Sequence, residues 1–246
     1  MLFRSLLAMP LVTGSRGGPV LRKALESRRA RLWLAANLPA ALRLLWLSGT
    51  VTLLYTLDRW AGIALLTKRE YGIFALGLLV ILVFETLQTV VNVAAYPLMG
   101  RMIAHDQHQR AFRLATLATA VVIAVTVVLY MPFILLIDFL VREYLPLYAD
   151  ATTVIKLAVI AGTLRLADFY SSFAVLCNQE RNLAWGFGVL VLVASAVVLG
   201  AGTIGHVRFN PDRMVIITVA VSACSFLLSL AVAARAQRQR RVLVLA

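Results

Sequence analysis

Long stretches without a single charged residue are the feature of this chain that most restricts how it can fold. Leu114–Ile137 and Asn182–Gly205 each run 24 residues without a charge, and Met214–Ala234 runs 21. A helix rises about 1.5 Å per residue, so about 20 apolar residues cross the hydrocarbon core of a bilayer. Other apolar stretches of similar length contain only a few charges. The sequence therefore predicts an all-α, polytopic membrane protein.

The composition agrees with a membrane protein and argues against a nucleic-acid-binding one. Hydrophobic residues make up 61% of the chain and charged residues only 14%, where soluble domains have about 25% charged residues. The net charge of +13 is high enough to suggest nucleic acid as a partner. However, the basic residues cluster at the ends of the apolar stretches, a pattern that sets orientation in a membrane. We therefore expect membrane lipid, and no nucleic acid, around this chain.

Neither the cysteines nor the histidines indicate a metal site or a cofactor. Cys177 and Cys224 lack the paired spacing of a disulfide or zinc framework. His105 and His108 lie three apart in a basic loop with Asp106, but a metal site needs more ligands than these. We expect no metal ion and no cofactor.

Six spans are predicted, and they divide the chain into three parts. Residues 1–38 form a basic cytoplasmic or interfacial segment, 39–236 a domain of six transmembrane helices, and 237–246 a basic cytoplasmic tail. A cleaved signal peptide is an alternative for the start, although the region after its short apolar run is strongly basic. Short connections predict antiparallel neighbours in a bundle. The predicted spans are Leu44–Thr67, Tyr71–Met99, Leu114–Val141, Ala151–Cys177, Asn182–Gly205 and Met214–Ala234.

The distribution of Lys and Arg predicts the orientation of these spans. The N-terminal segment, the second and fourth connections and the tail together hold 16 basic residues, and the three other connections with the span ends beside them hold 7. The side richer in Lys and Arg is normally the cytoplasmic one. Both termini are therefore predicted to be cytoplasmic, with Tyr144–Asp150 and Val207–Arg213 external.

Several short motifs resemble a known family of transporters. Thr56–Arg59 and the following Lys68–Ala75, with the sequence Lys-Arg-Glu-Tyr-Gly-Ile-Phe-Ala, resemble the start of the second half of polysaccharide flippases. Tyr96–Arg101 is similar to the tyrosine-proline exit from the next helix, and Glu143–Ala151 to an external loop of that half. These flippases belong to the multidrug/oligosaccharidyl-lipid/polysaccharide exporter superfamily. The resemblance implies a plasma membrane protein of the bacterial inner membrane that exports lipid-linked oligosaccharide for surface polysaccharide or O-antigen.

The length of the chain departs from that family. Its members carry two six-helix halves with the substrate cavity between them, and this chain of 246 residues resembles the second half alone. The resemblance therefore implies a homodimer, or pairing with a second six-helix half. A fragment of a longer flippase and a non-transporting accessory or structural subunit remain alternatives.

Polar residues within the second predicted span form the first candidate site. Glu85, Gln88 and Asn92 are spaced three and four residues apart, so they share one face of a helix. Such a stripe is either the wall of a cavity that contacts a polar headgroup or carries a proton, or a set of hydrogen bonds between helices. We favour the functional interpretation for Glu85 and the structural one for Gln88 and Asn92.

Two further candidate groups lie in the fourth and first predicted spans. Arg165 and Asp168 are three residues apart, so they are predicted to pair on one helical face. This pair is either structural or a cationic site, because a guanidinium matches the oxygens of a pyrophosphate. Asp58 and Arg59 are a similar candidate, with anchoring at the membrane surface as the alternative.

An enzyme is not expected. A membrane-bound transferase gathers acidic residues for a metal or a base in a surface loop, and the predicted loops are short and hold no such cluster. Membrane transport is therefore the predicted function.

Overall fold

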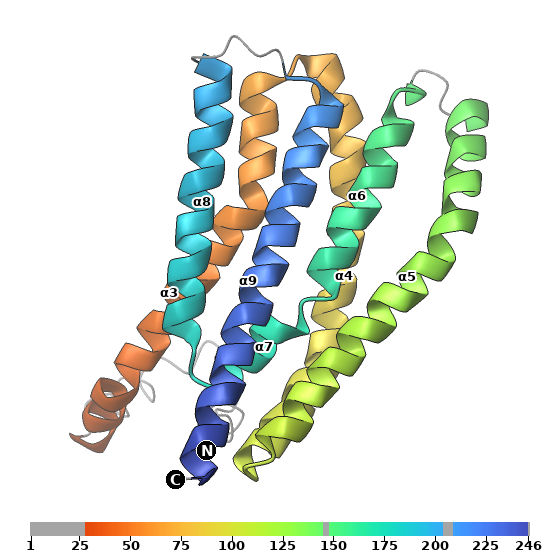
Figure 1. Cartoon of the computed structure of the whole chain (residues 1–246). Coiled ribbons are helices and arrows are strands. Elements are labelled where there is room, and N and C mark those ends of the chain that lie inside the picture. Colours follow the sequence, from red (N-terminus) through yellow and green to blue (C-terminus); the bar gives the residue numbers. More distant parts are fainter. Residues whose placement is uncertain (1–27, 145–147, 204–208, 246) are drawn as a thin grey trace, which may run out of the picture. The chain divides into compact units, whose positions relative to one another are not determined.

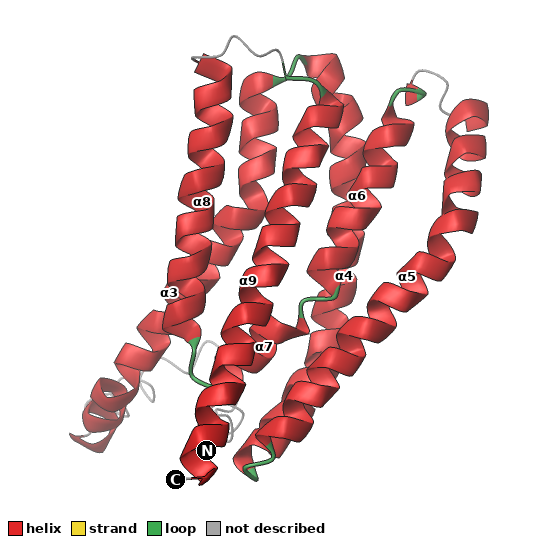
Figure 2. Cartoon of the chain, viewed as in Figure 1, coloured by secondary structure: helices red, strands yellow, loops and turns green. Residues whose placement is uncertain are grey.

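The computed structural model describes residues 28–144, 148–203 and 209–245, which contain seven α-helices and no strand (Figures 1 and 2). The predicted all-α fold is thus confirmed. The helices are α3 (Arg28–Leu65), α4 (Lys68–Ala104), α5 (His108–Tyr144), α6 (Ala151–Leu166), α7 (Phe169–Leu176), α8 (Glu180–Thr203) and α9 (Pro211–Leu245).

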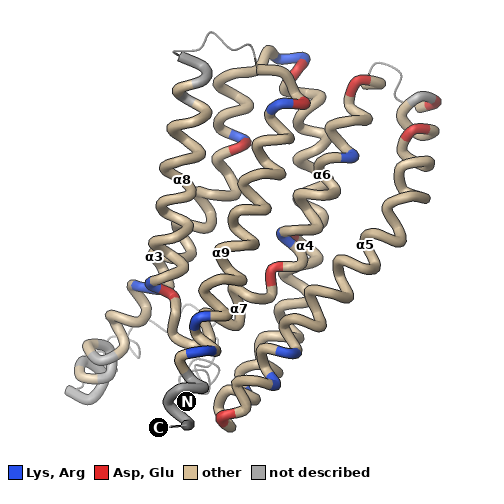
Figure 3. The backbone as a smooth tube through the Cα atoms, in the orientation of Figure 1, with Lys and Arg blue, Asp and Glu red and all other residues tan. Residues whose placement is uncertain are grey.

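Six segments in the described part of the chain are long and apolar enough to cross a membrane, as predicted. They are Asn37–Leu65, Lys68–Ala104, His108–Val141, Ala151–Leu176, Glu180–Val198 and Pro211–Gln239. The chain is therefore a polytopic helical membrane protein. Most charged residues lie near the helix ends, and a smaller group lies along the helices, within the spans (Figure 3).

The chain divides into two compact units, residues 1–46 and 47–246, and the boundary lies within α3. In the first unit the described residues, 28–46, are helical. This helix begins inside the segment predicted as basic and interfacial, whose first 27 residues lie outside the described ranges. At the other end, α9 continues through the predicted tail as far as Leu245. The second unit contains every predicted site residue.

Local sequence signals begin and end the helices of the second unit. Thr67 and Glu70 form a capping box at the start of α4, in which each side chain bonds the backbone of the other. After α4 and α7, Asp106 and Asn178 adopt left-handed conformations with φ of 58° and 60°. Backbone bonds from the following residue return to the last turn of each helix, as in a Schellman motif. These turns reverse the chain between α4 and α5 and between α7 and α8, and successive spans of the second unit run in opposite directions (Figure 1).

Helices α4 and α6 pack closely through two glycines. A Cβ atom on Gly77 would lie 2.7 Å from Val154 of α6, and one on Gly162 would lie 2.7 Å from the ring of Phe84 of α4. Real Cβ atoms do not approach other atoms so closely. Because Gly77 of α4 and Gly162 of α6 have no side chain, these two helices can approach each other this closely.

The buried apolar side chains of the second unit form two clusters. One includes Phe74, Ile81 and Val154, and the other includes Met99 and Phe173. Each of α3, α4 and α9 contributes to both clusters, as does the span formed by α6 and α7. Between its contributions to the two clusters, each of these spans carries polar residues, and these form the candidate site.

Candidate functional site

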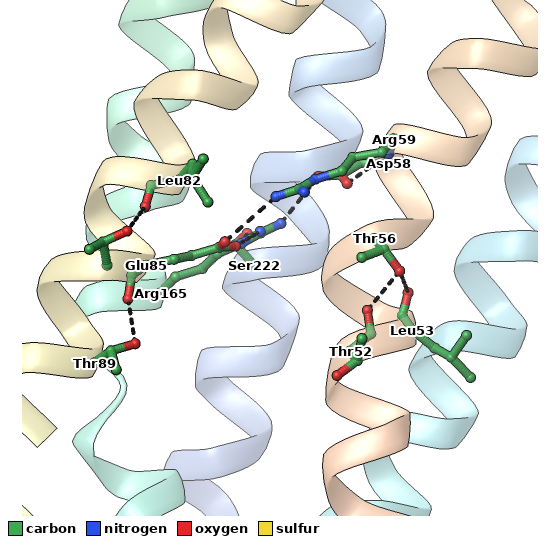
Figure 4. A network of polar contacts seen from close by, with 11 residues as sticks. Thr52, Leu53, Thr56, Asp58, Arg59, Leu82, Glu85, Thr89, Arg165 and Ser222 are labelled. Atoms are coloured by element: carbon green, nitrogen blue, oxygen red, sulfur yellow. Dashed lines mark hydrogen bonds and ion pairs between the residues drawn. The ribbon is translucent and has the colours of Figure 1, made fainter. Parts of the chain in front are cut away.

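The guanidinium of Arg165 is the centre of a network that joins four helices (Figure 4). Its Nη2 lies 3.3 Å from Asp58 Oδ2 of α3, its Nη1 donates to Glu85 Oε1 of α4, and its Nε donates to Ser222 Oγ of α9 at 3.1 Å. The guanidinium carbon also lies 4.4 Å from the centre of the Tyr55 ring, a cation–π contact. Only 2% of the Arg165 side chain is exposed. This cation is therefore held from four directions and shielded from its surroundings.

A second arginine brings the network to charge balance. Arg59 Nη2 lies 3.7 Å from Glu85 Oε2, so Glu85 bridges the two guanidinium groups. Asp58 is almost fully buried and also accepts the backbone N–H of Arg59 at 2.8 Å. A charge at the centre of a bilayer costs about 2.5–3.5 kcal/mol on insertion scales. Two cations and two anions that contact one another reduce this cost, although they do not by themselves make the fold more stable.

The predicted pairing of Arg165 with Asp168 is wrong. The spacing rule assumes one continuous helix, but α6 ends at Leu166 and α7 begins at Phe169. Asp168 is instead the N-cap of α7, where its Oδ1 accepts the backbone N–H of Ser171 at 3.1 Å. Its Oδ2 accepts the hydroxyl of Ser229 on α9 at 2.9 Å. The break redirects the two side chains to different partners.

The interruption between α6 and α7 lies inside the fourth span, which was predicted as one continuous helix (Figure 2). The hydroxyl of Thr119, on α5, donates to the carbonyl of Ala167 at 2.7 Å. The N–H of Phe169 donates to the same carbonyl at 2.9 Å. A broken helix is tolerated in a membrane where neighbouring protein groups or water satisfy its backbone. Thr119 is thus one of the residues that allow this break.

The structure divides the predicted stripe on α4. Glu85 enters the charged network, with 20% of its side chain exposed. Asn92 Oδ1 accepts a 3.4 Å hydrogen bond from Ser172 of α7, which joins two helices. Gln88 is half-buried. The helical face was predicted correctly, but its members make different contacts.

Asp58 and Arg59 both lie in the network, although adjacent residues on a helix point in different directions. Asp58 faces Arg165 in the interior of the bundle. The side chain of Arg59 is 38% exposed and contacts Glu85 at the edge of the network. Surface anchoring therefore does not describe Asp58, whose side chain is 8% exposed.

A polar stripe on α9 was missed. Thr218, Ser222, Ser225 and Ser229 are all buried and follow one another at intervals of four, three and four residues. Two of them bond the charged residues of α6 and of the break, as described above. The helical spacing of the hydroxyls was visible in the sequence and indicates one face of a helix. The identity of their partners was not.

A second ion pair joins α5 and α6 away from this network. Lys156 Nζ lies 2.8 Å from Asp138 Oδ1, and the hydroxyl of Tyr130 donates to the backbone carbonyl of Lys156 at 3.3 Å. These charged side chains are 26% and 34% exposed, so the pair is less enclosed than that of Arg165.

A small cavity adjoins the network and reaches both Asp58 and Arg165. Its volume of about 10 Å³ is close to the space that one water molecule needs. Apart from these two residues its lining is apolar, formed by Leu54, Leu57, Ala61, Val198, Met214, Ile217 and Val221. In this conformation the charged network is closed, because a saccharide or a lipid headgroup does not fit this space.

Comparisons with models of protein families, with curated proteins and with solved structures gave no match to this chain. The class that the fold and the described residues define is a six-span helical membrane protein with a buried charged network within its spans.

Proposed function

We propose that this chain is one six-helix half of a membrane transporter that moves lipid-linked oligosaccharide precursors to the outer leaflet for surface polysaccharide or O-antigen. The observation that carries the transport function is the charged network around Arg165, which joins four spans. Charged residues at membrane depth are rare and mark pathways for substrates or ions. The substrate class comes from the sequence motifs that resemble polysaccharide flippases.

An exchange of anions at Glu85 explains how the closed network binds its substrate. Glu85 bridges Arg165 and Arg59 and is more exposed than Asp58, which holds Arg165 from the interior. A pyrophosphate that replaces Glu85 would meet two guanidinium groups, each able to bind two of its oxygens. The anion is bound after the helices have separated, and the return of Glu85 closes the site again.

The proposed transporter needs a second six-helix half, provided by another copy of this chain or by another subunit. Transporters are commonly built from paired repeats that bind the substrate at their interface. The cavity beside Arg165 is far smaller than a lipid-linked saccharide. Crosslinking in native membranes is expected to capture a homodimer or a second subunit. Full transport by a monomer would contradict the requirement for a second half.

We place the protein in the bacterial inner membrane with both termini in the cytoplasm. The excess of basic residues on one side, 16 against 7, supports this orientation. In it, α3 carries the chain outwards and α9 returns it.

The decisive experiment distinguishes a role of the buried charges in transport from a role in folding. Replacing Arg165 alone leaves Asp58 buried without its cation, so the loss of export would not distinguish transport from folding. The triple variant Arg165→Met, Asp58→Asn, Glu85→Gln removes the buried charges together and is expected to fold. We expect it to reach normal levels in the membrane while lipid-linked saccharide accumulates on the inner leaflet. Normal export by the triple variant would show that the network is structural.

An accessory subunit without transport activity is the second candidate, and one observation favours it. Arg165 is fully enclosed by its own protein partners and contacts only a very small cavity. A structural network has these properties without any need to open. Arg59→Lys distinguishes the two functions, because lysine keeps the charge balance of the network but cannot bind two oxygens of a phosphate. A transporter is expected to lose part of its export with Arg59→Lys, whereas an accessory subunit is expected to be unaffected.

A further inference from the structure

Asp168 is a buried acid whose described partners are all uncharged. Its side chain is almost completely buried, and its hydrogen-bond partners among the described residues are the backbone N–H groups of Tyr170 and Ser171 and the hydroxyls of Ser171 and Ser229. The ion pairs of Arg59, Lys156 and Arg165 go to other carboxylates. Since a charge at membrane depth is costly without a counter-ion, a proton that binds to Asp168 removes this cost.

The helices that pack around the break present few other charged groups to Asp168. On α5 and α9 the described contacts at the break are the uncharged hydroxyls of Thr119 and Ser229. Tyr55 on α3 is a titratable side chain close enough to Asp168 for the two to interact electrostatically. The cations of the neighbouring helices include Arg59, Arg101, Lys156, Arg165 and Arg181. Arg59, Lys156 and Arg165 bind other carboxylates, and no ion pair of the described residues joins Arg101 or Arg181 to Asp168.

The position of Asp168 links its charge to the conformation of the fourth span. It lies at the junction of α6 and α7, caps α7 through Ser171, and joins this junction to α9 through Ser229. Hydrogen bonds to an ionised carboxylate are stronger than those to a neutral acid. A change in the charge of this one residue therefore alters how firmly the break is held against α9.

We propose that Asp168 is a proton-binding site whose protonation weakens the contact of the α6–α7 junction with α9 and couples proton movement to transport. This inference rests on the proposed transport function. One proton from water binds Oδ2, and the carboxylate becomes a neutral carboxylic acid. The Ser229 hydroxyl, which donates to the ionised form, then rotates to accept the new O–H. Oδ1 continues to accept the Ser171 N–H, more weakly than before.

Glu85, the acid that the sequence first suggested for this role, is less suited to it. Two guanidinium groups contact Glu85 in the closed network, so protein cations already compensate its charge. Asp168 has no described partner of that kind, and it lies at a break in the helix, where its hydrogen bonds decide a conformation. The two carboxylates therefore have different roles. The anionic substrate replaces Glu85 at the two guanidinium groups, and Asp168 binds the proton.

Infrared difference spectroscopy of the full chain in lipid vesicles tests the proton site directly. Between mildly alkaline and mildly acidic buffer, the wild-type protein is expected to gain the C=O stretching band of a protonated carboxylic acid. Asp168→Asn, which has the same shape and no titratable group, is expected to lose that band, and the matched variant Glu85→Gln to keep it. Ser229→Ala keeps Asp168 and is expected to shift the frequency of the band, because the acid loses a hydrogen-bond partner. The proposal is overturned if the wild-type protein shows no such band, or if Asp168→Asn retains it fully.

A transport measurement then distinguishes the coupling from the transport function itself. Vesicles that contain the protein with its partner half would be loaded with lipid-linked oligosaccharide, and its transfer between leaflets followed with and without a proton gradient. Wild-type transfer is expected to accelerate with the gradient, and Asp168→Asn is expected to exchange substrate without responding to it. Transfer that ignores the gradient in the wild-type protein refutes the coupling and leaves the transport function standing. No transfer at all refutes the transport function, while the infrared band still reports on Asp168.

Discussion

Removal of the Arg165 charge is expected to be one of the most destabilising single changes within the spans. Arg165→Met keeps the length of the side chain but removes the three nitrogens of the guanidinium. Asp58 then loses its cation, and Ser222 loses the N–H that donates to its hydroxyl oxygen. Glu85 keeps the more distant Arg59 at 3.7 Å. Leaving one partner of a buried ion pair uncompensated costs about 3–5 kcal/mol. We expect the free energy of unfolding of Arg165→Met to fall by about that amount.

The size of this effect depends on the network being enclosed, which gives two controls. Lys156→Met breaks the partly exposed pair with Asp138, which lies within two turns of the ends of α5 and α6, where charged side chains reach the membrane surface. Ion pairs at such a surface contribute only about 0–1 kcal/mol. Adding Asp58→Asn and Glu85→Gln to Arg165→Met removes the uncompensated charges, so we expect most of the loss to be recovered. Equilibrium unfolding in mixed detergent micelles, followed by helical circular dichroism, measures all three variants. The reasoning fails if Arg165→Met is no more destabilising than Lys156→Met, or if the triple variant recovers nothing.

Three further predictions test packing, the break in the fourth span and the orientation. Gly162→Ala is expected to lower the free energy of unfolding by about 1–3 kcal/mol, because the new Cβ would overlap the ring of Phe84 on α4. Gly200→Ala serves as the control, because a Cβ at that position has nothing within 4 Å. Thr119→Val is expected to cost about 1–2 kcal/mol in the same assay, because the carbonyl at the break loses its side-chain donor; an unchanged value would contradict the role of that hydrogen bond. Single cysteines at Tyr148 and Gln239 are expected to react with an impermeant thiol reagent from opposite sides of the membrane, and labelling from the same side would refute the orientation.

The sequence by itself determined the fold class and the number of spans. Both follow from the length of the apolar stretches, because in lipid every backbone group must be satisfied within the chain and a helix does this locally. The faces of the helices were also predictable, because the positions of residues three and four apart on a helix are fixed. Asp58, Glu85 and Arg165 were recognised as candidates for the same reason: each is a charge where the membrane makes charges costly.

Only the tertiary structure decided which of these charges meet. Asp58 is 107 residues from Arg165 along the chain and Glu85 is 80, and spacing rules do not reach across helices. The predicted partner, Asp168, was near in sequence, but the break after Leu166 turned it towards Ser171 and Ser229. Asp168 is a preferred N-cap residue and was a local signal of that break, but the hydrogen bond from Thr119 of another helix could not be read from the fourth span alone. A charge within a span could therefore be identified from its sequence, whereas its partners are set by helix packing.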